Sequence, residues 1–454
     1  MFHHRGMRTF TLIWFGQMVS MLGSKMTAFA LLTWAYQQTG QATTLALLGF
    51  FSFLPYVLVS PLAGVWVDRF DRRKVMMLAD TAAGLTTVFL FVMFVTGQLQ
   101  IWHIYLAELL GSACGAFHFP AYNASVTLLA PKSQLARANG MRSLGQYLAE
   151  VGAPFLAGMV LALAGIGVVM LFDLVTFVFA VSTLLLVHIP QPEVSAEGRA
   201  ARGSTRQEMA FGFRYIWARK GLLGLLLIFT GINLFAALTY YGVMPSMILG
   251  RTGGDEMALA SVQGAMGLGG VLGGLVVSVW GLPKRRIHAV LSGTAASFLL
   301  GDLLFATGRT LPVWILAGLL GSFFIPILVS GERAIWQAKV PPDVQGRVFA
   351  VNGMIRTAMM PLGYVLGGVL ADYVFEPALA VGGSLADTLG WLVGTGPGAG
   401  IALMFFGTMF MGTTLCLGSY LIRAVRCVED DLPDYDAAPE NMPLPTELAA
   451  VGAD

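Results

Sequence analysis

The chain has 454 residues, of which 56% are hydrophobic and only 11% are charged, whereas soluble domains carry about 25% charged residues. Most of the chain therefore cannot face water, which excludes a string of soluble domains. The net charge of +2 gives no reason to expect a nucleic-acid partner, and three scattered cysteines predict neither a disulfide framework nor a zinc site.

Apolar runs of the length needed to cross a bilayer, about 20 residues, follow one another with short polar breaks. The first run is longer than the apolar region of a signal peptide, so we expect it to be retained as a helix. The sequence predicts an all-α membrane protein with twelve transmembrane helices, at residues 9–35, 43–67, 75–96, 100–129, 139–163, 167–189, 221–249, 257–281, 288–307, 311–338, 347–373 and 399–424.

The positions of lysine and arginine predict the orientation, because cytoplasmic loops carry an excess of both. With the N-terminus in the cytoplasm, only Arg251 and Arg309 of the 27 basic residues fall in outer segments, and four lie within predicted helices. The remaining 21 (27 − 2 − 4) fall in cytoplasmic segments. We therefore expect both termini in the cytoplasm.

A polar stretch near the middle of the chain divides the predicted helices into two sets of six. We expect an N-terminal six-helix bundle at residues 1–189, a cytoplasmic linker at 190–220 and a C-terminal bundle at 221–428. The acidic tail at 429–454 has a composition typical of disorder. In the linker, a capping-box pattern precedes apolar residues at helical spacing. This predicts an interfacial helix whose apolar face is formed by Met209, Phe213, Ile216 and Trp217.

The two halves look like a repeat. An offset of 210 residues pairs Gly64 with Gly274 and Lys74 with Lys284, at equivalent helix ends. Two similar six-helix halves with a binding site between them, at the middle of the membrane, are a plan of secondary transporters.

The loop after the second predicted helix combines a glycine, an aspartate and a basic cluster, formed by Gly64, Asp68, Arg69, Arg72, Arg73 and Lys74. It resembles the loop signature of the major facilitator superfamily, although Asp71 stands where a glycine is common. A second copy keeps Gly274 and the basic run 284–286 but has Ser278 in place of the aspartate, an asymmetry also usual in that family.

The resemblance implies that this is a gating loop. Physically, a carboxylate at a helix end can face the positive N-terminus of a neighbouring helix while arginines hold it. Such a latch would close one face of the protein and release when the halves rock. A plain positive-inside loop would carry the same charges.

More of the chain, nearly everything from residue 8 to 430, resembles bacterial efflux permeases of the transmembrane secretion effector kind. Residues 20–24, 119–122 and 137–141 carry this resemblance in the first half, and 278–288, 334–349 and 394–400 carry it in the second. It implies the major facilitator fold, two pseudo-symmetric six-helix bundles, in the bacterial cytoplasmic membrane. It also implies efflux of small molecules such as macrolides, siderophores or peptide antibiotics.

The small residues in 140–158 resemble a motif of the antiporter branch, and ordinary helix packing explains them as well.

Ionisable residues inside a membrane indicate function by default, because burying them is costly. Lys25 and Glu108 lie at similar depths in the first and fourth predicted helices, which line the central cavity in the family that the chain resembles. We therefore hypothesise an ion pair between them that couples transport. A static pair that only fixes packing is the alternative, and Glu150 could compete as the partner of Lys25.

Further candidates lie on other predicted helices. Glu332 and Arg333 are nearer the cytoplasm, where they could belong to an inner gate, and Arg142 and Arg356 could bind an anionic group. Three carboxylates on helices that are peripheral in the family are expected to have structural roles: Asp80, Asp173 and Asp302. Side chains that could line a substrate cavity, or simply pack between helices, are Gln17, Trp34, His118, Tyr122, Asn233 and Tyr240.

Other chemistries find no support in the sequence. It contains no GxxxxGK[ST] phosphate loop and no HExxH motif, and we expect no cofactor and no metal. We expect a monomeric secondary transporter, in contact with the lipid bilayer, that exports a small amphipathic molecule by alternating access and uses protons as the coupling ion. The alternatives are an uptake permease or a lipid flippase of the same fold, a membrane-embedded enzyme, and a receptor without transport.

Overall fold

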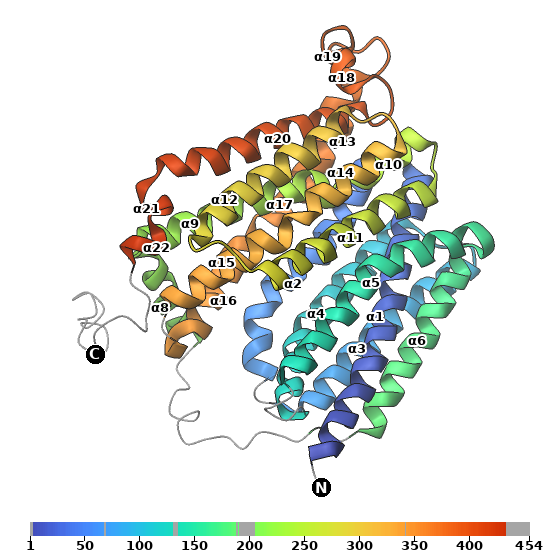
Figure 1. Cartoon of the computed structure of the whole chain (residues 1–454). Coiled ribbons are helices and arrows are strands. Elements are labelled where there is room, and N and C mark those ends of the chain that lie inside the picture. The colour runs from blue at the N-terminus through green and yellow to red at the C-terminus, as the bar shows by residue number, and fades with distance from the viewer. Residues whose placement is uncertain are drawn as a thin grey trace.

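The computed structural model describes residues 3–67, 70–129, 135–187, 189, 205–340 and 342–432. These residues are largely helical, and the helices form two bundles, one from each half of the chain (Figure 1). The N-terminal half, blue to green in the figure, consists of α1 (His3–Thr39), α2 (Ala42–Val67), α3 (Arg72–Val95), α4 (Ile101–Leu129), α5 (Leu135–Ala164) and α6 (Ile166–Leu186).

The C-terminal half is built from helices that are mostly interrupted. Its composite helices are α9 (Lys220–Ala236) with η2 (Ala237–Tyr241) and α10 (Met244–Thr252); α12 (Arg286–Ala296) with η3 (Ser297–Asp302) and α13 (Leu303–Thr307); α14 (Leu311–Phe323) with α15 (Ile325–Lys339); and α16 (Pro342–Ala358) with α17 (Met360–Leu370), η4 (Ala371–Phe375) and α18 (Glu376–Leu379). The others are α11 (Glu256–Trp280) and α20 (Ala399–Gly418), which ends in η5 (Ser419–Leu421). A short helix, α19 (Ala386–Val393), lies in the connection before α20.

Prolines explain several of these interruptions. Pro245, Pro326 and Pro361 lie in the first turns of α10, α15 and α17. Proline has no N–H to donate and its ring clashes with the carbonyl one turn earlier, so it ends one helical segment and starts the next.

Ten helical stretches of the described chain are long and apolar enough to cross a membrane, and they correspond to ten of the twelve predicted spans. The other two predicted spans are α1 and α4, which have 37 and 29 residues. Both carry ionisable side chains, Lys25 on α1 and Glu108 and His118 on α4, which lower their mean hydropathy. Both lie inside the N-terminal bundle, α1 against α5 and α6, and α4 against α2 and α3.

The two halves meet along the helix pairs α2 with α17 and α5 with α11. Small residues permit this close approach. A β-carbon at Gly368 on α17 would lie 2.7 Å from Ala46 of α2, and one at Gly267 on α11 would lie 2.5 Å from Val151 of α5. Glycines of α11 therefore serve close helix packing.

Hydrogen bonds also join the halves at the end of the molecule where α1 leads into α2. Gln37 Nε2 on α1 donates to Glu256 Oε1 on α11 over 2.7 Å. The Asp372 carboxylate of η4 accepts from the backbone N–H groups of Ala42 and Thr43, over 2.9 and 2.7 Å. The connection between α1 and α2 is tight because Gly40 adopts a positive φ of 63°.

The linker contains α8 (Thr205–Trp217), which packs against α16 and α9. Its predicted apolar face is divided between two environments. Ile216 is only 2% exposed and belongs to the core of the C-terminal half, whereas Trp217 is 72% exposed and Phe213 is 41% exposed. The helix is therefore anchored to the C-terminal bundle by one part of the face that we expected to lie wholly in the membrane interface.

The chain after α20 folds back onto the C-terminal bundle as α21 (Arg423–Arg426) and α22 (Val428–Asp431). Glu429 Oε2 accepts from the N–H of Ile287 at the start of α12 over 2.9 Å, and its carbonyl accepts from Lys339 Nζ over 2.6 Å. Asp430 pairs with Arg285 over 3.3 Å. The prediction of disorder from residue 429 is therefore wrong for 429–432, because basic groups and a helix N-terminus bind these acidic residues. Residues 433–454 lie outside the described residues.

Candidate transport cavities

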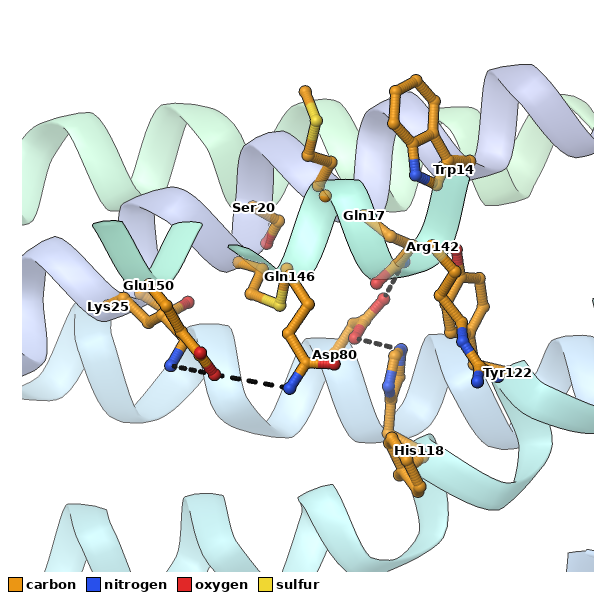
Figure 2. Close-up of a pocket in the computed structure, with 15 residues that line it drawn as sticks. Trp14, Gln17, Ser20, Lys25, Asp80, His118, Tyr122, Arg142, Gln146 and Glu150 are labelled. Carbon is orange, nitrogen blue, oxygen red and sulfur yellow. Dashed lines mark hydrogen bonds and ion pairs between the residues drawn. The ribbon is translucent and has the colours of Figure 1, made fainter. Parts of the chain in front are cut away.

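A cavity of about 360 Å³, which we call the N-half cavity, lies between α1, α3, α4 and α5 (Figure 2). All the residues that line it come from the N-terminal half. Six predicted site residues from the coupling and cavity sets line it together with Asp80: Gln17, Lys25, His118, Tyr122, Arg142 and Glu150.

Lys25 on α1 pairs with Glu150 on α5 in the N-half cavity. Their charged atoms lie 3.8 Å apart, and both side chains are about 40% exposed, at 41% and 40%. Gln146 Nε2, one turn before Glu150, donates to the same carboxylate over 3.3 Å. The alternative partner considered from sequence is thus the one that the structure provides.

The hypothesised pair between Lys25 and Glu108 is wrong. Glu108 faces α2, where its carboxylate accepts a hydrogen bond from the Ser52 hydroxyl. Ser112, one turn further along α4, donates to the Ser52 carbonyl over 2.5 Å. These contacts hold α4 against α2, and Glu108 is absent from the lining of the described cavities.

Asp80 on α3 is the residue of the N-half cavity that sequence reasoning missed. Its Oδ1 lies 3.1 Å from His118 Nε2 on α4, and its Oδ2 accepts from Gln17 Nε2 on α1 over 2.8 Å. The side chains of His118 and Asp80 are 21% and 17% exposed. Asp80 therefore has partners, as a structural role requires, and it also lines the cavity, which the predicted peripheral position of the third helix did not indicate. An ionisable residue inside a membrane indicates function by default, and this rule could have identified Asp80 as a cavity residue.

The C-terminal half has a cavity of about 290 Å³, the C-half cavity, between η2, η3, α9, α15 and neighbouring helices. Its lining includes Asn233 and Tyr240, expected from sequence, with Arg333, Arg356 and several apolar residues. Beside it, a second cavity of about 300 Å³ is lined by Glu332 together with the same two arginines.

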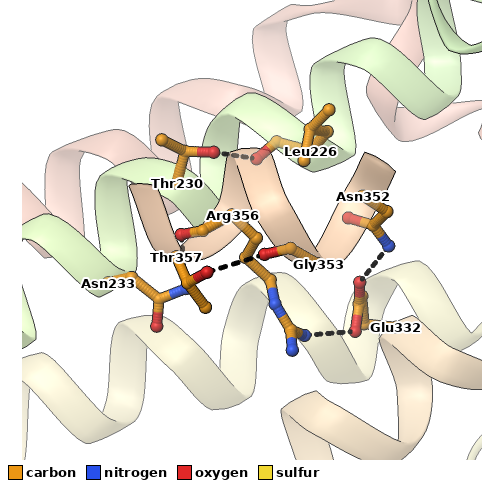
Figure 3. A network of polar contacts seen from close by, with 8 residues as sticks. All are labelled: Leu226, Thr230, Asn233, Glu332, Asn352, Gly353, Arg356 and Thr357. Carbon is orange, nitrogen blue, oxygen red and sulfur yellow. Dashed lines mark hydrogen bonds and ion pairs between the residues drawn. The ribbon is translucent and has the colours of Figure 1, made fainter. Parts of the chain in front are cut away.

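A buried ion pair fixes the wall between these two cavities (Figure 3). Arg356 Nη1 on α16 lies 3.2 Å from Glu332 Oε2 on α15, and Glu332 is only 2% exposed. Asn352 Nδ2 donates to the other carboxylate oxygen over 3.4 Å. Asn233 Nδ2 on α9 donates to the Arg356 carbonyl over 3.0 Å, which joins a third helix to the network.

Asp173 and Asp302, for which the sequence predicts structural roles, lie within helices and are absent from the lining of the described cavities. Asp173 on α6 accepts from Ser24 over 3.0 Å and from Thr87 over 3.2 Å. Asp302 accepts from the Thr408 hydroxyl over 2.6 Å and is fully buried.

The predicted gating loop is only partly described. Asp68 and Arg69 lie outside the described residues, and the side-chain surroundings of Gly64 are not described either. Asp71, where the sequence departs from the family pattern, is the N-cap of α3, because its side chain accepts from the N–H groups of Arg73 and Lys74. The Arg73 guanidinium donates to the carbonyls of Leu184 and Leu185 at the C-terminal end of α6, over 2.7 Å each.

Trp34, another predicted cavity residue, packs against the hydrophobic core at the α1–α2 end of the molecule. It does not appear in the lining of the described cavities. Its position is that of a helix-packing residue.

Two membrane helix bundles that meet along a few helices, each with a cavity, are the plan of a secondary transporter. A family model assigns the chain more closely: that of the Major Facilitator Superfamily matches residues 13–364, so the chain belongs to this family. It is accordingly a membrane transporter and not an enzyme.

Relatives and solved structures agree with this assignment. Macrolide efflux protein A of Streptococcus pyogenes is 28% identical over 374 residues, which cover 80% of this chain and 90% of that protein. The multidrug efflux pump Tap of Mycolicibacterium fortuitum is 24% identical over 379 residues, covering 80% and 88%. A bacterial homologue of the human lysosomal transporter Spinster, in an inward-facing and unoccupied conformation, has the same fold, with a TM-score of 0.66 and 15% identity over 95% of this chain and 99% of that one.

Proposed function

We propose that this transporter exports a small amphipathic molecule from the bacterial cytoplasm in exchange for protons. The observation that carries the proposal is the pair of titratable contacts in the N-half cavity, Lys25 with Glu150 and Asp80 with His118. Ionisable groups inside a membrane protein are costly to bury, and they mark substrate pathways and proton relays by default. The efflux function printed for two relatives supports the outward direction.

The lining of the C-half cavity favours a substrate with a large apolar part. Phe229, Tyr240, Tyr241 and Phe298 contribute aromatic surface there, and Asn233 and Arg333 contribute polar groups. Pockets of this kind bind ligands by apolar contact and orient them with few polar groups. A macrolide is the first substrate to test, because relatives carry that word in their names.

The transporter of this proposal works as a monomer in the bacterial cytoplasmic membrane, with both termini in the cytoplasm. Its twelve transmembrane helices are the ten apolar stretches together with α1 and α4. In this orientation the end where α1 leads into α2 faces outward. The hydrogen bonds between the halves at that end then close the outer face.

A transport assay tests the proposal. Everted membrane vesicles that contain the protein are expected to accumulate a radiolabelled macrolide when respiration acidifies their interior, and to lose it when an uncoupler is added. Vesicles without the protein are the control. Accumulation only in right-side-out vesicles would favour an uptake permease, and accumulation that resists the uncoupler would contradict proton coupling. If no macrolide moves, transfer of a fluorescent lipid between leaflets tests the flippase alternative.

A further inference from the structure

We propose that Asp80 and His118 together form the site that binds the coupling proton. This inference rests on the proposed function and deepens it. The carboxylate oxygen and the imidazole Nε2 are 3.1 Å apart. The buried Nε2 has no hydrogen-bond partner in the described structure, so the contact is electrostatic: a proton gained by the imidazole gives a cation that the neighbouring carboxylate stabilises.

The pair can gain or lose one proton while its two groups stay in place. With a neutral imidazole, the pair has a charge of −1. A proton gained by the imidazole makes the histidine cationic, so the charge of the pair becomes zero. Histidine is suited to this role because it exchanges protons at the pH of the cell. Gln17 holds the other carboxylate oxygen in either state, over 2.8 Å.

The other charged and titratable groups around the pair have different assignments. On α5, Glu150 is bound to Lys25 of α1, and Arg142 faces the same cavity (Figure 2). On α4, the Tyr122 ring stacks on the His118 ring, with centroids 6.1 Å apart. On α6, Asp173 is bound by hydroxyl groups. The contact between Asp80 and His118 thus joins two titratable groups directly across α3 and α4.

Proton-driven and proton-independent transport separate this proposal from a structural role. Asp80→Asn and His118→Gln are expected to lose macrolide accumulation driven by the proton gradient. Both are expected to retain counterflow, the exchange of labelled for unlabelled macrolide without a gradient. Asp173→Asn is the control, because Asp173 is a carboxylate of the same half that accepts from hydroxyl groups and is absent from the lining of the N-half cavity; it should keep gradient-driven accumulation. Glu150→Gln is measured beside these variants.

Each outcome bears on a different statement. If the wild-type protein accumulates macrolide but ignores the uncoupler, the proposed proton coupling fails. If the wild-type protein is coupled and Asp80→Asn and His118→Gln stay coupled, the assignment of the proton site fails while the function stands. Loss of coupling in Glu150→Gln alone would move the site to the pair with Lys25.

A different observation carries a second inference independently. We infer that Asp372 is a latch that holds the outer face closed. Its two carboxylate oxygens accept from the N–H groups of Ala42 and Thr43, which begin α2 in the other half of the molecule. The first turn of α2 has no acidic residue of its own. The carboxylate from η4 therefore supplies the negative charge that a helix N-terminus favours.

Rocking of the halves must break this contact. The start of α2 is packed against α17, where Gly368 lets Thr43 and Ala46 approach closely. Opening the outer face separates these helices and leaves both N–H groups and the carboxylate to water.

Glu376 provides a matched control for this test. It lies one turn after Asp372, and its carboxylate accepts from the N–H groups of Gly398 and Ile401, over 3.0 Å each. This cap joins parts of the same half, so its loss does not release the other half. Both residues are carboxylates that accept from backbone N–H groups. Asp372 connects the two halves, whereas Glu376 connects parts of one half.

Distances between spin labels across the outer face test the latch. The labels are attached in a variant without Cys114, Cys416 and Cys427. One lies at Gln38, which is exposed, and the other at Val381, which is 87% exposed, so their distance reports on separation of the halves. Asp372→Asn and Asp372→Ala are expected to shift the distance distribution to longer values, and Glu376→Gln is expected to leave it unchanged. An unchanged distribution in both Asp372 variants, or an equal shift in Glu376→Gln, would overturn the inference. Elution as a single species in size-exclusion chromatography identifies folded variants, and either Asp372 variant suffices.

Discussion

Arg356→Ala is expected to lower the free energy of unfolding by about 3–5 kcal/mol, because it leaves a buried carboxylate without its counterion. Glu332 is 2% exposed, and its only other described hydrogen bond, from Asn352, is long at 3.4 Å. Equilibrium unfolding in detergent micelles, followed by tryptophan fluorescence, measures the loss.

Two control variants distinguish this explanation from a general loss of packing. Glu332→Gln combined with Arg356→Met removes both charges, keeps similar volumes and should recover most of the stability. Lys25→Met breaks a pair that is about 40% exposed on each side, at 41% and 40%, with its charges 3.8 Å apart. It should cost less than about 1 kcal/mol, as exposed pairs do. Equal losses in Arg356→Ala and Lys25→Met would contradict the role of burial.

The helices themselves could be predicted because length and hydropathy are local properties of the sequence. The predicted span at residues 221–249 corresponds to the stretch Lys220–Thr252, and the one at 311–338 corresponds to Leu311–Lys339. The interruptions within them depend on more than composition. Proline accounts for the break before α15, but the π-helical turn η3 contains no proline, so its sequence carries no such signal.

The partner of Lys25 could not be predicted from depth in the membrane alone. Two side chains meet only if they lie at a similar depth and also point towards each other. The rise of 1.5 Å per residue gives a similar depth for Glu108 and Glu150. The direction in which each side chain points depends on how its helix is rotated in the bundle. That rotation turns Glu108 towards Ser52 of α2 and Glu150 towards α1.

Asp80 shows a second limit of sequence reasoning. Placing α3 at the periphery was an inference from the family, and it treated the helix as if all its residues shared one environment. In the structure, α3 packs against α4 and α6, and the face that carries Asp80 reaches His118 and Gln17. A peripheral helix can thus contribute a single side chain to the cavity.

Gly273→Val is expected to prevent stable folding, with a cost of more than about 3 kcal/mol, the upper range for overpacking. Gly273 on α11 faces α14 and α15. A β-carbon there would overlap the carbonyl oxygen of Phe323 and lie 3.3 Å from Pro326. Phe323 would meet it with backbone atoms, which cannot rotate away as a side chain can. The two helices would have to separate along their whole contact. Size-exclusion chromatography of a fluorescent fusion in detergent measures the folded fraction.

Gly270→Val is the matched control, because a β-carbon at Gly270 has no neighbouring atom within 4 Å in the described structure. Both changes introduce the same β-branched residue into the middle of the same helix, so their effects on helix propensity cancel. Any difference between them must come from what each side chain meets. If Gly273→Val elutes as the same folded species as Gly270→Val, α11 and α14 do not approach as closely as the structure places them. The contact within the C-terminal half would then have room to adjust while the halves rock.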